Sequence, residues 1–153
     1  MSMSDTISVL NHLTRLCRDC ERSCESLVRT APRAATAELL RARAGEWGRQ
    51  GDELQALVLL TGRAPPTSGS AAAAAQRALW RLEGWLQAPP EPLLLRRWQA
   101  LQQRAAECYE AALGVRMPER IRRTVALQAQ RVRDRCAVSR VRAGARALHS
   151  PAR

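Results

Sequence analysis

Three cysteines on one stretch of the chain are the residues whose spacing most suggests chemistry. Cys17, Cys20 and Cys24 follow one another at intervals of three and four residues, so a helix places their thiols on one face. Neighbouring thiolates can share a soft metal ion such as Cu(I) or Zn²⁺, or take part in redox reactions. Buried free cysteine also packs as a small hydrophobe, and this packing role is the favoured interpretation.

Disulfide bonds are not expected from these cysteines. The chain has five cysteines, which is an odd number, and three of them lie on one predicted helix, where disulfide geometry is poor. We therefore expect free thiols.

Carboxylates and histidines that could bind iron are sparse. A di-iron centre in a helical bundle needs a Glu from each of two helices and a Glu-x-x-His motif from each of the other two. The sequence has no Glu-x-x-His, and its histidines are His12, near the start, and His149, near the end. Glu21 and Glu53 are carboxylates near the predicted core, although pairing with arginine or solvent is the plainer interpretation. The candidate metal ligands, thiols included, are Cys17, Cys20, Cys24, Cys136, Glu21 and Glu53.

The basic residues gather toward the end of the chain. All 25 are arginine, which indicates a biased source composition, and residues 116–153 supply nine of the eleven net positive charges. Clustered guanidinium groups can neutralise phosphates, so weak nucleic-acid binding is one alternative function. The arginines are spread around the predicted last helix, however, and no aromatic stacking platform accompanies them, which favours a solvated surface.

No motif of an enzyme or of a membrane protein is present. The sequence lacks a Gly-rich phosphate loop and a Gly-x-Ser-x-Gly turn, so we expect a non-enzymatic protein with no identifiable small-molecule substrate or cofactor. It also has no apolar run of bilayer length and no secretion signal. We therefore expect a cytoplasmic protein.

The candidate residues named above are predicted to lie on helices. Phe is absent and Leu, Ala and Val supply the apolar mass, which favours helix over sheet. Apolar residues recur every three or four positions in long segments, bounded by Pro and Gly. Four long helices are predicted over about 5–30, 32–62, 91–113 and 118–144, and a short Ala-rich helix within the connection 63–90.

The lengths of the connections predict the architecture. Two tight hairpins joined by a connection of nearly thirty residues are typical of a four-helix bundle of ferritin-like connectivity, with the extra helix on the crossover. We expect one domain over residues 4–147 and a flexible tail over 148–153. In this arrangement Cys136 lies about 27 Å along its helix, near the level of Cys24, so Cys20, Cys24 and Cys136 could converge. Cys108 falls well below them.

Specific blocks of sequence resemble a known family. They are Ile7 to Asn11, Cys17 with Asp19 and Glu21, Glu53 to Val58, Ser68 to Ser70, and Tyr109 to Leu113. Over about residues 7–134 the chain resembles the bacterial ferritin-like four-helix-bundle family called domain of unknown function 2383. The resemblance implies a relationship to di-iron carboxylate bundles, with an acidic pair in the third long helix and a histidine in the fourth. The matching positions here are Gln102, Gln103 and Arg133, so the di-iron ligands are expected to be lost.

The leading hypothesis is a non-enzymatic bundle that acts through its surface. Trp80 and Trp85 lie on the short crossover helix, and large apolar groups there can form an interface, so we expect a homo-oligomer. The competing hypothesis is a thiol-based metal-binding or redox protein that uses the cysteines of the first helix.

Overall fold

The chain is built of helices. The computed structural model describes residues 2–63, 69–86 and 89–148, with backbone only at 71–72, 83–86 and 140–148. These residues form five helices and no strand, which confirms the predicted all-α class. The helices are α1 (Met3–Thr30), α2 (Ala34–Leu60), α3 (Ala71–Leu86), α4 (Glu91–Leu113) and α5 (Glu119–Leu148). His149 and the predicted tail after residue 148 lie outside the described residues.

The helix ends follow local sequence signals. Ser2 caps α1, which therefore begins at Met3 and not near residue 5 as expected. The Ser2 hydroxyl accepts a hydrogen bond from the amide of Ser4 at 3.1 Å and satisfies a free donor of the first turn. The chain turns after α2 at Gly62, whose φ is 78°. This left-handed conformation costs glycine little energy, because glycine has no Cβ. Gly114 follows the last turn of α4.

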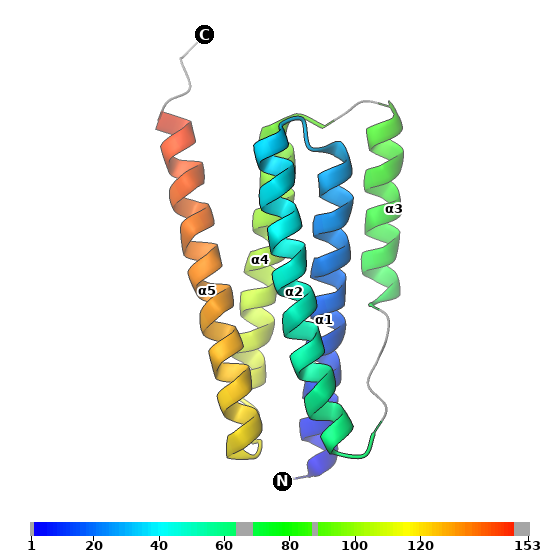
Figure 1. Cartoon of the computed structure of the whole chain (residues 1–153), viewed down its shortest axis with the longest axis vertical. Coiled ribbons are helices and arrows are strands. Elements are labelled where there is room, and N and C mark those ends of the chain that lie inside the picture. Colours follow the sequence, from blue (N-terminus) through cyan, green and yellow to red (C-terminus); the bar gives the residue numbers. More distant parts are fainter. Residues whose placement is uncertain (1, 64–68, 87–88, 149–153) are drawn as a thin grey trace.

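The helices run side by side along one long axis (Figure 1). α1 and α2 form one antiparallel hairpin, and α4 and α5 form a second one. α3 returns along the outside of α1, so α4 starts at the end of the bundle where α2 also starts. As a result α2 and α4 run in the same direction, and α5 runs parallel to α1.

The apolar stripes predicted from the sequence face the centre of the bundle. The apolar stripe of α1 is buried throughout, and Trp47 of α2 is almost fully buried. The stripe consists of Leu10, Leu13, Cys17, Cys20, Cys24 and Leu27. α1 and α2 approach closely where Gly48 faces the carboxylate of Glu21. The hydrophobic effect of these stripes fixes which faces of the helices meet.

The crossover helix α3 is attached to α1 by polar contacts. The backbone amide of Ser70 donates to Asp19 Oδ1 at 2.9 Å, and the guanidinium of the buried Arg77 lies 3.8 Å from the same oxygen. On its other face α3 exposes Leu79 and Leu82. None of the helices, over the described residues, has the length and apolar character needed to cross a membrane.

Candidate functional site

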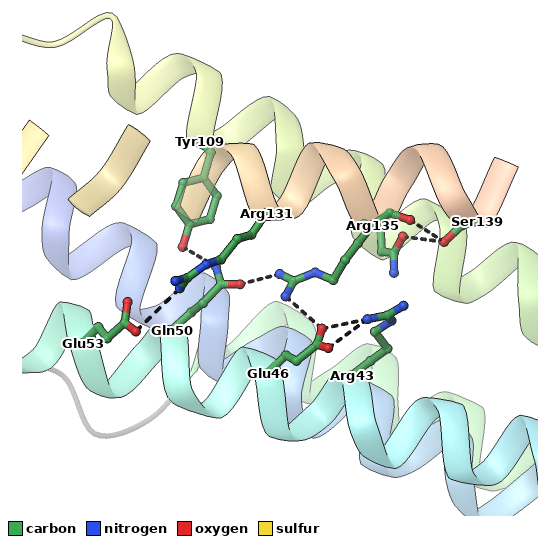
Figure 2. A network of polar contacts seen from close by, with 9 residues as sticks. Arg43, Glu46, Gln50, Glu53, Tyr109, Arg131, Arg135 and Ser139 are labelled. Carbon is green, nitrogen blue, oxygen red and sulfur yellow. Dashed lines mark hydrogen bonds and ion pairs between the residues drawn. The ribbon is translucent and has the colours of Figure 1, made fainter. Parts of the chain in front are cut away.

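A buried network of polar side chains joins α2, α4 and α5 in the middle of the bundle (Figure 2). Its first centre is the hydroxyl of Tyr109, a fully buried residue of α4. This hydroxyl donates to Gln128 Oε1 at 2.8 Å and accepts from Gln50 Nε2 at 3.2 Å. Cys17 Sγ lies 3.3 Å from the same oxygen. Because the single phenolic proton goes to Gln128, the Cys17 thiol is the donor in this contact.

Gln128 connects the phenol to α2. Its Nε2 donates to Glu53 Oε2 at 2.8 Å and to the backbone carbonyl of Gln50 at 3.2 Å. Both protons of this amide and its oxygen therefore have partners, and the residue itself is fully buried. A buried amide with all its partners fixes the relative rotation of two helices, because any other rotation would leave polar atoms unpaired.

Arg135 of α5 is the second centre of the network. The residue is only 9% exposed, and its Nη1 donates to Glu46 Oε2 at 3.0 Å while its Nη2 donates to Gln50 Oε1. The guanidinium also lies 4.6 Å from the centre of the Trp47 ring, a favourable distance for a cation–π contact. A buried cation is thus held by a carboxylate, an amide and an aromatic face.

Two arginines share the carboxylate of Glu46. Arg43 Nη1 lies 2.9 Å from both of its oxygens, and Arg135 binds one of them. Partial burial alone would raise the pKa of Glu46, but the hydrogen bonds and charges of Arg43 and Arg135 lower it below its ordinary value. The carboxylate is therefore ionised at neutral pH.

The predicted family position Gln102 extends the network along α4. Ser139 Oγ lies 2.9 Å from Gln102 Oε1 and 2.8 Å from the backbone oxygen of Arg135. Gln102 is only 1% exposed, and its Nε2 has no hydrogen-bond partner. Gln103 is exposed instead and pairs with Glu107. Of the two amides that match the family's acidic pair, only Gln102 faces the core.

The side chains in this network do not fit a di-iron centre. Such a centre needs several carboxylates and imidazoles with free lone pairs facing one another. The network instead offers amides that already bind one another, a neutral phenol, and a guanidinium, whose positive charge repels a metal cation. Among the described residues, no three His, Cys, Asp or Glu side chains lie close enough together to hold a metal ion. His12 is exposed, away from the network.

The cysteines proposed as ligands are buried. Burial raises the pKa of Cys17 to about 12, and the charge of Arg135 opposes this rise only in part. Burial likewise raises the pKa of Cys24 to about 12 and that of Cys20 well above its ordinary value. Cys136 is also buried. Because metal binding and nucleophilic attack require the thiolate, raised pKa values disfavour both reactions at neutral pH.

The two candidate glutamates make ion pairs with arginine. Glu21 lies 3.2 Å from Arg18, which also contacts Asp52, and Glu53 lies 3.7 Å from Arg131. On α5, Arg133 contacts Glu110. Much of the arginine charge on the bundle is thus matched by carboxylates, as expected for a charged helix surface.

Arg135, Gln50 and Gln128 were not predicted as functional residues from the sequence. The sequence of α5 does contain a pattern that indicates two of them. Gln128, Val132, Arg135 and Ser139 are spaced at intervals of three and four residues. They share the face of the predicted core stripe. Polar residues on such a face need buried partners, and this requirement indicates a network.

Comparison with known proteins gives a match to a protein family but to no individual protein. The model of one family matches residues 5–115, from the first turn of α1 to just past α4. The match ends before α5, whereas the resemblance was expected to reach residue 134. No curated protein and no solved structure gives a significant match. Since the matched segment is most of the chain, this protein belongs to the family described as domain of unknown function (DUF2383).

Proposed function

We propose that the chain is a non-enzymatic bundle of ferritin-like connectivity that works through its surface as a homo-oligomer. In this proposal the network around Tyr109 and Arg135 stands where di-iron bundles hold their metal ligands. The cytoplasm is the proposed location, because all five cysteines are free and a reducing compartment keeps thiols in this state.

The path of the chain supports the ferritin-like frame. α1 with α2 and α4 with α5 form two hairpins, and the crossover carrying α3 returns along the bundle (Figure 1). This long connection makes α2 and α4 parallel, whereas short loops throughout would make every successive pair of long helices antiparallel.

The buried guanidinium of Arg135 is the observation that carries the non-metal part of the proposal. It lies between α2 and α5 at the level of Gln50, and its bonds to Glu46 and Gln50 use the acceptors that a metal would need. Removing water from a cation is costly unless the cation is paired, so the pairing is essential to the fold. The network therefore acts as a structural core element.

Exposed leucines on α3 support the oligomer. Leu79 and Leu82 are 55% and 52% exposed and lie one turn apart on the face turned away from α1. Trp80, one of the two tryptophans that suggested an interface, is instead partly buried, with the Arg97 guanidinium 5.2 Å from its ring centre. The side chain of Trp85 lies outside the described residues. The leucines thus replace the tryptophans as the proposed contact.

Sedimentation velocity over a wide concentration range tests the oligomer. The native chain should sediment as a discrete oligomer, and the double variant Leu79→Ser with Leu82→Ser should shift to the monomer. Leu127→Ser is the matched control, because Leu127 is equally exposed on α5. A native chain that remains monomeric at every concentration would contradict the proposal, as would an oligomer that survives the double variant unchanged.

A further inference from the structure

A charged cleft lies between α2 and α5, on the solvent side of the polar network. Its volume is about 460 Å³, which is in the range of small-molecule sites. We call it the α2–α5 cleft, and it is lined by Arg43, Glu46, Arg49, Gln50, Glu53, Arg131, Asp134 and Arg135. Four guanidinium groups face three carboxylates, so the lining carries an excess of positive charge.

The deepest part of the α2–α5 cleft has more donors than acceptors. The guanidinium groups of Arg43 and Arg135 both pair with the single carboxylate of Glu46, which can neutralise only one of the two positive charges. The Nε atoms of both arginines are buried and have no hydrogen-bond partner. Two desolvated N–H donors without acceptors cost stability. Both guanidinium groups line the cleft, so their positive charge favours an anion there.

The outer part of the α2–α5 cleft offers further positive charge. Arg49 is exposed, and Arg131 is half exposed and lies 3.7 Å from Glu53, beyond hydrogen-bond distance. The remaining carboxylate, Asp134, accepts a hydrogen bond from Gln130 at 2.8 Å. Arg49 and Arg131 therefore add positive charge at the exposed part of the cleft, beside the more buried Arg43 and Arg135.

We propose that the α2–α5 cleft binds a small oxyanion, whose oxygens accept hydrogen bonds from the exposed guanidinium groups of Arg49 and Arg131 and are attracted by the charges of Arg43 and Arg135 beneath them. Guanidinium groups bind phosphate and carboxylate through paired, charge-assisted hydrogen bonds. The ligand class is thus a small molecule that carries a phosphate or a carboxylate group. This site is independent of the proposed oligomer, because α3 contributes no residue to it.

Calorimetric titration with two probes tests the site and distinguishes phosphate ligands from carboxylate ligands. Inorganic phosphate and succinate are titrated separately into the native chain at constant ionic strength, held with chloride. Saturable binding of at least one probe is expected, and a rise in the melting temperature should accompany it. Binding of phosphate alone assigns the site to phosphate compounds, and binding of succinate alone assigns it to carboxylates.

Variants at the mouth show whether the binding uses this cleft. Arg49→Gln with Arg131→Gln should weaken binding about tenfold or more, the loss expected from charge-assisted contacts. Both side chains are exposed, so the variant should fold, as checked by circular dichroism. Arg41→Gln, an exposed position of α2 outside the lining, is the matched control and should bind as the native chain does. No binding of either probe, or equal binding by both variants, would overturn the proposal.

Discussion

Removing the hydroxyl of Tyr109 should destabilise the protein well beyond the loss of one hydrogen bond. In Tyr109→Phe the ring can stay in place, but Gln128 Oε1 and Gln50 Nε2 each lose their hydrogen bond to the phenol. Both glutamines are buried, so water cannot readily replace the phenol. Two buried amide groups are thus left unpaired, and the buried Cys17 thiol also loses its acceptor.

The magnitude follows from the cost of unpaired groups. Each buried donor or acceptor without a partner costs about 1–3 kcal/mol, so the variant should lose about 2–6 kcal/mol of unfolding free energy. For a chain of this size, that loss lowers the melting temperature by roughly 10 °C.

Urea denaturation followed by circular dichroism measures the change in unfolding free energy. The slope with urea should stay constant while the midpoint falls, because only stability changes. Gln103→Leu is the control, since Gln103 is exposed on the same helix and should change stability by less than about 0.5 kcal/mol. A Tyr109→Phe variant as stable as this control would refute the structural role of the network.

Two further predictions concern the buried thiols and the glycines. The pKa values of Cys17 and Cys24 are raised from 9.0 to about 12, so the stability they contribute is complete below pH 9.0 and is lost as pH rises toward 12. Denaturation at about pH 8 and pH 10 should show a loss of roughly 1 kcal/mol per thiol, and a constant free energy would be inconsistent with burial. Gly69→Ala should loosen the docking of α3, because a Cβ would lie 1.8 Å from Asp19 Oδ1; faster hydrogen exchange in α3 is the readout. Gly45→Ala, with no atom nearer than 3.8 Å, should instead stabilise the chain by about 1 kcal/mol, and equal effects of the two changes would argue against the docking contact.

Much of the fold could be predicted because periodicity alone determines which face of a helix is buried. The stripe of α1 is unbroken from Leu10 to Leu27, and all of its predicted members are buried. Pro and Gly marked the ends of the helices to within a few residues. The start of α1 was less certain, since Ser2, Ser4 and Asp5 can all cap a helix.

The polar network could not be predicted in the same way. Arg135 was counted among solvated arginines, because charged side chains are seldom buried unless they are paired. Its pairing depends on how α5 rotates against α2, and this rotation follows from three-dimensional packing. Gln102 was noted only as a departure from the family's acidic pair, and its contact with Ser139 joins two helices. Residue type predicts the loss of metal ligands, and we propose that the Arg135 network takes their place.

The replacement of metal ligands by the Arg135 network is tested most directly by iron binding. Iron(II) is added to the reduced protein without oxygen, unbound iron is removed, and the iron that remains is measured by elemental analysis. We expect no stoichiometric iron and no change in melting temperature, because a buried guanidinium holds the acceptors at the centre of the bundle. Stoichiometric iron that raises the melting temperature, and is lost when Glu46 and Glu53 are both changed to Gln, would contradict the account.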